Sequence, residues 1–358
     1  MRRKTMETNL NETNVTENSA VSPEVTKSAK KDFSKIGLFL LLGTLIIFAV
    51  QMGAVAISEN VPAIANSADL SFICSMLPMY VIAMPIIFLI FKKIPVTITG
   101  EKKQMKPIHI LAAFAIGYAG TYACNLIGTL ITTVVGILKG GQVDNVVLNL
   151  TSSISPITTL VVVAVCAPIM EELMFRKMLI DRTYKYGEGM SIVFSGLVFG
   201  LFHGNLNQFA YAFFLGIFFG FIYVKTKNIV YPIILHMITN FIGSFVGTFI
   251  LEKSRFLEFA TRLTEVTADP TTMDPNAMMN LLGEYAGGIL LFFGYAMCLF
   301  AVVITGLIIF LVNKKKFTLS PGVVTIEKGK RFSTMVLNVG VILYSIFWIV
   351  NIVLQLFQ

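Results

Sequence analysis

Charged side chains are scarce in this sequence, and they are nearly absent from its long apolar runs. Of 358 residues, 13% are charged and 55% are hydrophobic, a balance outside the usual range of soluble globular proteins. Cysteine is also rare, and none of the four cysteines stands at a spacing typical of metal ligands. There is no internal repeat of the kind that supports an inverted-repeat transporter. The composition therefore predicts an integral membrane protein.

Nine apolar runs approach or exceed the length of about 20 residues that a helix needs to cross a bilayer core of about 30 Å. They are residues 36–57, 70–91, 108–138, 157–180, 190–203, 207–224, 229–250, 288–312 and 334–357. The fifth run is short, and it either stops at His203-Gly204-Asn205 before crossing or continues past Gly204. The sequence thus predicts an all-α, polytopic membrane helix bundle with eight or nine transmembrane helices.

Basic residues fall almost entirely on one side of these runs. The connections on that side hold 24 of the 28 lysines and arginines, and the other side holds Lys139, Lys253, Arg255 and Arg262. Since cytoplasmic loops are rich in lysine and arginine, we expect the N-terminus inside the cell and, with nine spans, the C-terminus outside. This distribution explains the net charge of +8 without a nucleic-acid partner. We expect membrane lipid as a partner and the cell membrane as the location.

The segments outside the central runs divide the chain further. Residues 1–35, rich in Thr, Asn, Glu and Ser, predict a disordered cytoplasmic tail. Residues 36–138 form the predicted N-terminal transmembrane helices, and residues 288–358 form the C-terminal ones. Between the two groups, residues 251–287 form the longest predicted extracytoplasmic connection.

One apolar run carries three ionisable residues, Glu171, Glu172 and Arg176. An unpaired charge at a helix centre costs about 2.5–3.5 kcal/mol, so these side chains must face protein or water. Glu172 and Arg176 are four apart in the order that favours an ion pair, whereas Glu171 points about 100° away from Glu172. Glu171 is then a spare buried carboxylate, which is suited to proton transfer. A purely structural ion network is the alternative.

Two further stretches place functional side chains on single helix faces. Phe199 and His203 are four apart, and so are His236 and Asn240. Counted at 1.5 Å per residue from the inner helix ends, Glu171 lies about 13 Å deep, His236 about 10 Å and His203 about 20 Å. Agreement requires the fifth helix to begin a few residues outside the hydrocarbon. The three side chains would then share a cavity open to the cytoplasmic side.

The ordered set Glu171-Glu172-x3-Arg176, Phe199-x3-His203 and His236-x3-Asn240 resembles the three motifs of a known family of intramembrane endopeptidases. This is the CAAX protease and bacteriocin-processing family, also called CPBP or Abi, which is related to the type II CAAX prenyl endopeptidases. The resemblance covers about residues 157–250, our predicted catalytic core. It implies hydrolysis of a membrane-associated peptide, CAAX-like or bacteriocin-like.

The resemblance also implies a role for each motif residue. Glu171 would activate the attacking water together with His203. His236 and Asn240 would stabilise the oxyanion, as an imidazole N–H and an amide can do in a dry site. The supporting residues would be Glu172, Arg176 and Phe199.

Three alternatives stay open at this point. Glu171, His203 and His236 could supply three ligands to a divalent metal such as zinc, although the absence of His-Glu-x-x-His favours a metal-free reaction. A non-catalytic bacteriocin immunity or membrane scaffold protein would use the same cavity only for binding. A proton-coupled transporter would use the buried acid and imidazoles as a proton relay.

Overall fold

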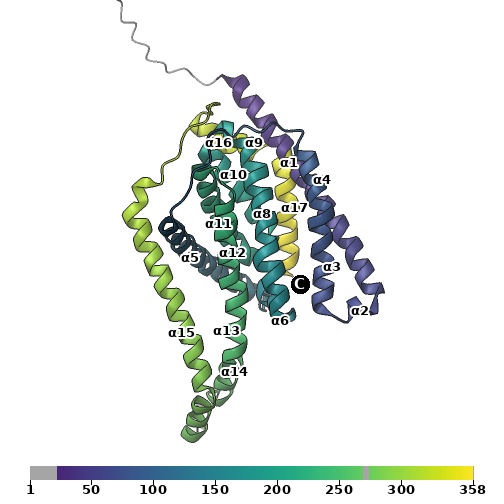
Figure 1. Cartoon of the computed structure of the whole chain (residues 1–358). Coiled ribbons are helices and arrows are strands. Elements are labelled where there is room, and N and C mark those ends of the chain that lie inside the picture. Colours follow the sequence, from purple (N-terminus) through teal and green to yellow (C-terminus); the bar gives the residue numbers. More distant parts are fainter. Residues whose placement is uncertain (1–21, 269–273, 358) are drawn as a thin grey trace, which may run out of the picture.

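A computed structural model describes residues 22–268 and 274–357, and within these ranges the chain is helical and has no β-strand (Figure 1). Eight helices are long and apolar enough to cross a membrane, judged by length and composition. A ninth apolar helix, α10 (Glu188–Phe202), is shorter. The protein is therefore a multi-pass integral membrane protein with a helical bundle, as its sequence predicts.

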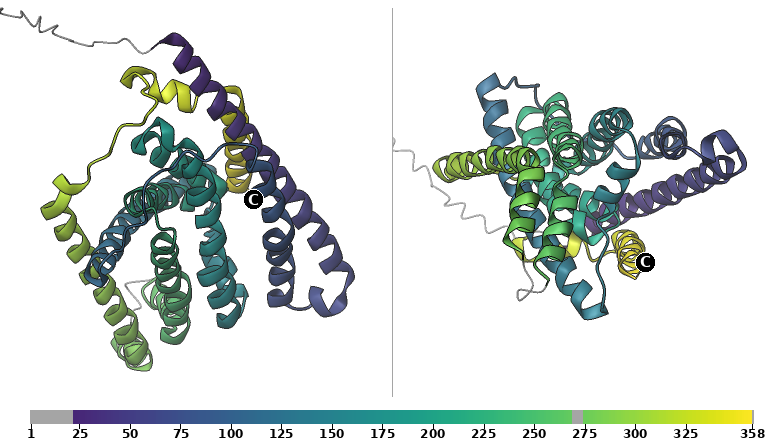
Figure 2. Two further views of the ribbon diagram at one scale, coloured as in Figure 1. Left: turned by 45° about the horizontal axis from the view of Figure 1, so that its top comes forward. Right: turned by 90° about the horizontal axis from the view of Figure 1, so that it is seen from below.

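The long helices run alternately up and down the bundle (Figure 1). They are α1 (Pro23–Asn60), α3 to α4 (Ala68–Phe91), α5 (Pro107–Lys139), α7 to η4 (Pro156–Tyr186), α10, α11 (Leu206–Thr226), α12 to α13 (Val230–Ser254), α15 (Pro275–Asn313) and α17 (Val339–Leu356). Short helices occupy the connections, namely α2 (Pro62–Ala65), α6 (Val146–Ser153), α14 (Phe256–Val266) and α16 (Arg331–Met335). Figure 2 shows α1 and α3 projecting on one side of the bundle, opposite α15.

The two ends of the bundle differ in charge and contacts. At one end, Lys185 forms an ion pair with Asp32 at 2.6 Å, and the backbone N–H of Thr97 donates to the carbonyl of Asp181. We call this the basic end, because its connections (92–106, 181–187, 227–229 and 314–330) carry 13 of the 28 lysines and arginines. The opposite end holds α2, α6 and α14, and we call it the far end. There Lys139 donates to the carbonyl of Leu356, so the last helix ends on this side.

α1 begins at Pro23 rather than at residue 36, so the prediction of a disordered tail over residues 1–35 is wrong for residues 23–35. Ala29 and Phe33, four apart, are buried against the core. The ring of Phe33 lies 5.1 Å from that of Tyr186, between centroids. Composition did not predict this buried face, because polar residues in the segment outnumber the few apolar residues that pack against the core. Residues 1–21 lie outside the described residues.

α15 begins at Pro275 rather than at residue 288, and part of the predicted 251–287 connection is therefore helical. The side chain of Asp274 caps α15 by accepting from the N–H of Asn276 at 2.9 Å. α14 packs against the first turns of α15 through Phe259, Leu281 and Tyr285. The sequence predicted only a connection here, and this small apolar cluster extends the two helices beyond the bundle. Residues 269–273 lie outside the described residues.

The fifth apolar run stops before crossing, which is the first of the two predicted alternatives. α10 ends at Phe202, Gly204 adopts a positive φ of 64°, and the side chain of Asn205 caps α11 by accepting from the N–H of Gln208. With 15 residues, α10 is about 22 Å long, less than the bilayer core of about 30 Å. The turn that carries His203 therefore lies at membrane depth.

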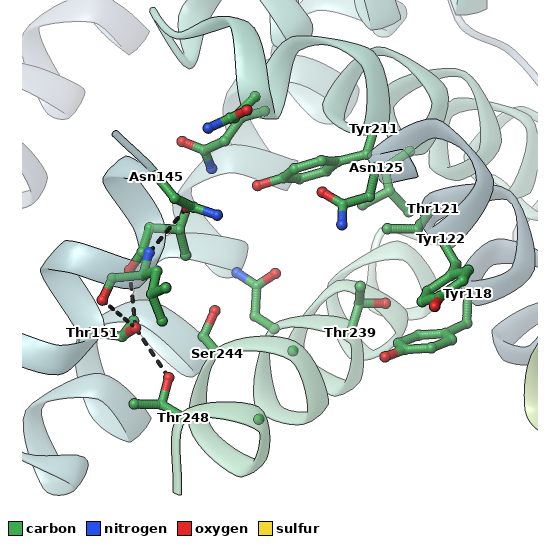
Figure 3. A pocket seen from close by; sticks show the side chains of 18 of the residues that line it. Tyr118, Thr121, Tyr122, Asn125, Asn145, Thr151, Tyr211, Thr239, Ser244 and Thr248 are labelled. Carbon is green, nitrogen blue, oxygen red and sulfur yellow. Dashed lines mark hydrogen bonds between the residues drawn. The ribbon is translucent and has the colours of Figure 1, made fainter. Parts of the chain in front are cut away.

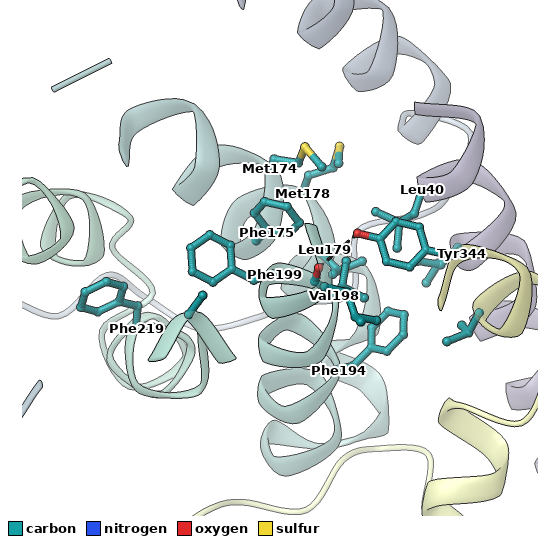
Figure 4. Packing of buried hydrophobic residues seen from close by; sticks show 14 of the residues in the cluster. Leu40, Met174, Phe175, Met178, Leu179, Phe194, Val198, Phe199, Phe219 and Tyr344 are labelled. Atoms are coloured by element: carbon teal, nitrogen blue, oxygen red, sulfur yellow. Dashed lines mark hydrogen bonds between the residues drawn. The ribbon is translucent and has the colours of Figure 1, made fainter. Parts of the chain in front are cut away.

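The largest hydrophobic core of the described residues packs α10 against its neighbouring helices, and Figure 4 shows part of it. Phe175, Leu179, Phe194 and Val198 are fully buried in it. The hydroxyl of Tyr344 on α17 donates to the carbonyl of Val198 at 3.1 Å. These side chains fill the basic half of the bundle and hold α10 against the neighbouring helices.

α1 and α17 cross where two glycines meet. A Cβ added at Gly37 would lie 2.4 Å from the backbone of Gly340, far below van der Waals contact. We expect Gly37→Ala to push the helices apart and destabilise the protein by about 1–3 kcal/mol, measured as a lower thermal unfolding midpoint in detergent. Gly53 lies on the same helix with open space around it, so Gly53→Ala is the matched control and should not lower the midpoint. Equal midpoints for the two variants would contradict this contact.

Candidate functional site

The helix that carries the two glutamates changes its winding twice. It runs through α7 (Pro156–Thr158), η2 (Thr159–Cys166), α8 (Ala167–Glu172) and η3 (Leu173–Ile180), where η2 and η3 are wider π-helical stretches. Such stretches often occur at functional sites, because they release backbone groups from regular pairing.

Pro168 explains why one backbone carbonyl, that of Val163, lacks a partner within its helix. A π-helical carbonyl pairs with the N–H five residues later, and for Val163 that residue is Pro168, which has no N–H. The N–H of Ala167, the α-helical partner, donates to Val162 instead. The free carbonyl of Val163 accepts a hydrogen bond from the side-chain amide of Asn240 at 3.0 Å. Pro168 thereby creates the acceptor that orients Asn240.

Glu172 and Arg176 form the buried ion pair that their spacing predicts. Arg176 Nε lies 3.0 Å from Glu172 Oε2, and both side chains have no exposed surface. The other carboxylate oxygen, Oε1, lies 2.9 Å from Nδ1 of His236 on α12. The guanidinium carbon sits 4.4 Å from the centre of the Phe199 ring. Glu172 thus serves two partners on two helices, and sequence analysis found only the first.

Glu171 is the spare carboxylate, as the spacing predicts. Its side chain is 20% exposed, and Oε2 lies 3.6 Å from Nε2 of His236. Within the described residues, no lysine or arginine forms an ion pair with it. This carboxylate is the accessible acid of the cluster.

In both histidines, one ring nitrogen makes a hydrogen bond within the described residues and the other makes none. Nδ1 of His203 lies 2.9 Å from the carbonyl oxygen of Phe199, and it must donate because a carbonyl only accepts. Nδ1 of His236 donates to the carboxylate of Glu172 in the same way. The ring centroid of Phe199 lies 4.7 Å from that of His203 and 5.9 Å from that of His236. Phe199 therefore packs against both rings, whose Nε2 atoms have no hydrogen-bond partner among the described residues.

These side chains meet at one cavity of about 430 Å³. Its lining includes all four residues predicted to be catalytic, namely Glu171, His203, His236 and Asn240. Sequence analysis missed Gln208, Tyr211 and Tyr80 in the same lining. Gln208 and Tyr211 could have been found from the sequence, because they are polar positions three apart in an apolar run.

The prediction that this cavity opens toward the cytoplasmic, basic end is wrong. From Glu171 toward that end, the next turns present Glu172, Phe175, Arg176 and Leu179, all fully buried. The rest of the lining comes largely from the far half of the bundle, including α6 and the residues that follow the α10–α11 turn. Counting depth from the basic end placed the residues at membrane depth, but it could not show that the core fills that half.

The charges of the cluster leave room for one additional proton. Glu171 and Glu172 carry two negative charges, and Arg176 supplies one positive charge. His236 and Glu171 are close enough to exchange that proton through one water molecule. The arrangement can therefore accept and return a proton at the cavity.

The described residues contain no group of three His, Cys, Asp or Glu side chains placed to hold a metal ion. Glu171, His203 and His236 line one cavity but do not close into such a set.

A comparison with known families matches one segment of the chain. Residues 153–242 match the family model described as type II CAAX prenyl endopeptidase Rce1-like. This segment is therefore similar to Rce1-like proteins over about a quarter of the chain. Every motif residue, from Glu171 to Asn240, lies inside the matched segment.

Two curated relatives extend this comparison. The chain is 26% identical over 166 residues to "Putative membrane peptidase YdiL" of Bacillus subtilis (strain 168), covering 45% of this chain and 66% of that protein. It is 33% identical over 106 residues to "Membrane-embedded CAAX protease MroQ" of Staphylococcus aureus (strain USA300), covering 28% of this chain and 42% of that protein. The match thus spans less than two thirds of either relative. No solved structure matches the chain significantly.

Proposed function

We propose that the protein is an intramembrane endopeptidase in which Glu171 activates a water molecule for attack on a peptide bond. One observation carries this proposal: a single cavity joins an unpaired carboxylate, two imidazoles with a free Nε2 and the amide of Asn240. The similarity to Rce1-like proteins and the names of the two relatives point to the same class of reaction.

The proposed reaction uses each of these side chains in turn. Glu171, assisted by Nε2 of His203, takes a proton from water as its oxygen attacks the carbonyl carbon. The resulting oxyanion accepts hydrogen bonds from Nε2–H of protonated His236 and from the second amide N–H of Asn240. The C–N bond then breaks, and the proton returns to the leaving nitrogen. The products are a carboxylic acid and an amine, which become a carboxylate and an ammonium group by proton exchange, and the cluster regains its charge.

The position of the cavity indicates the kind of substrate. His203 lies in a turn at membrane depth, and the cavity is enclosed by helices that can span the membrane. A peptide must therefore enter the bilayer region to reach Glu171. We propose a peptide or protein with a membrane-associated segment as the substrate.

The test compares peptide termini in cells that produce the wild type or Glu171→Ala. We expect a set of C-terminal peptides that appears only with the wild type, while both proteins reach equal amounts in the membrane. Because the proposed reaction uses no metal, a chelator should leave this set unchanged. Identical termini in both cells would refute the peptidase proposal, and loss of the set with the chelator would refute the metal-free reaction.

A further inference from the structure

A second cavity adjoins the first one beside Asn240. It has a volume of about 310 Å³ and lies between α5, α6, α11 and the α12–α13 helix. We call it the polar cavity. Gln208, Tyr211, Asn240 and Ser244 line both this cavity and the one at Glu171. A single layer of side chains therefore separates the polar cavity from the proposed catalytic cavity.

The lining of the polar cavity is rich in amides and hydroxyls but contains no Asp, Glu, Lys, Arg or His. Four of the lining residues lie on α5, namely Tyr118, Thr121, Tyr122 and Asn125 (Figure 3). They stand at positions i, i+3, i+4 and i+7 and therefore share one helix face. Asn125 is exposed and lines the polar cavity. Since unsatisfied polar groups are costly in lipid, this face is suited to a polar ligand.

The polar cavity leads toward the far end of the bundle. Asn145 and Thr151, which line it, belong to the far-end connection that contains α6. A further cavity of about 400 Å³ shares Thr151, Ser244 and Thr248 with the polar cavity and reaches Arg255 and Glu258. Cavities with common walls thus follow one another from the far end to Glu171. On the other side of Glu171, toward the basic end, Phe175, Arg176 and Leu179 are fully buried.

We propose that the substrate reaches Glu171 from the far end, and that the polar cavity binds an extended stretch of its main chain with uncharged side chains. The inference rests on the proposed peptidase function. The peptide group both donates and accepts hydrogen bonds, and so do amide and hydroxyl side chains. A lining without ionisable counter-charges disfavours a charged substrate side chain. Because the basic end faces the cytoplasm by the positive-inside rule, the substrate is an exported peptide or an outward segment of a membrane protein.

Membrane vesicles of opposite orientation test the route. A mixture of peptides from a digested proteome is added outside right-side-out and inverted vesicles, each with wild type or Glu171→Ala, and new termini are measured by mass spectrometry. We expect at least tenfold more Glu171-dependent cleavage in the right-side-out vesicles. Equal or greater cleavage in inverted vesicles would overturn the route but keep the peptidase. Lack of Glu171-dependent cleavage in both orientations and in detergent would overturn the peptidase function itself.

Substitutions on α5 test the polar cavity with one peptide cleaved in the first experiment. Thr121→Leu and Asn125→Leu should each lower kcat/KM about tenfold, mainly through a higher KM, because they remove polar groups from the lining. Thr133 lies on the same helix, is exposed and is not part of the lining, so Thr133→Leu is the matched control with unchanged kinetics. Wild-type KM in both test variants would overturn the binding role of this cavity.

Discussion

Glu171→Gln is expected to lower the rate of peptide-bond cleavage by about 10²–10⁴-fold, the usual contribution of a general base. Glutamine keeps the size and polarity of the side chain but cannot take a proton from water. Glu171 makes no ion pair with a lysine or arginine within the described residues, so the folded structure should tolerate the change. The measurement is the initial rate of cleavage by purified protein in detergent, with a peptide identified by terminal profiling.

A matched variant separates this effect from a general loss of activity. Glu59 lies on α1, is exposed and lines none of the three cavities described above, so Glu59→Gln should keep the wild-type rate. Both variants should elute as the wild type does in gel filtration and unfold at its temperature. Cleavage by Glu171→Gln within a factor of ten of the wild type would show that another group is the base.

Arg176→Met is expected to destabilise the protein by about 3–5 kcal/mol, because it leaves the carboxylate of Glu172 buried without its counter-charge. Neither side chain of this pair is exposed, so water cannot replace the lost partner. The measurement is denaturant unfolding in detergent or mixed micelles. Arg262→Met is the matched control, since Arg262 pairs with Glu284 at an exposed site where such pairs contribute about 0–1 kcal/mol.

A double substitution distinguishes stability from catalysis in the same cluster. Glu172→Leu combined with Arg176→Met replaces both charges with apolar groups, and much of the lost stability should return. Activity should stay low, because Nδ1 of His236 loses the carboxylate that fixes its ring. Full activity in the double variant would mean that Glu172 does not orient His236.

Local spacing predicted those parts of the site that depend on a single helix. Glu172 and Arg176 pair because they are four positions apart on one helix. Glu171 is five positions from Arg176, so it stays outside this pair. The sequence left open whether the fifth run continues past Gly204, and the positive φ of Gly204 and the cap of Asn205 show that it stops there. The site residues themselves were found through the resemblance of three motifs, and the structure brings all four proposed catalytic side chains to one cavity.

Local sequence patterns did not predict the features that depend on packing between distant segments. The contact between Glu172 and His236 joins residues 64 positions apart on two helices, and no periodicity in either segment specifies it. The direction of the cavity was mispredicted for the same reason, since Phe33 and Phe194 fill the basic half only after α1 packs there. In the same way, the sequence around Phe33 could not show that this residue is buried, because the rings that it packs against are distant in the chain.

Pro168 and Asn240 form a unit that sequence variation should respect. A proline without Asn240 would leave the carbonyl of Val163 unsatisfied inside the membrane, and an asparagine without the proline would lose the acceptor that sets its rotamer. Homologues are therefore expected to keep or exchange the two positions together, although they stand on different helices. The absence of an N–H at Pro168 thus couples the evolution of this irregular helix to the evolution of the Asn240 side chain.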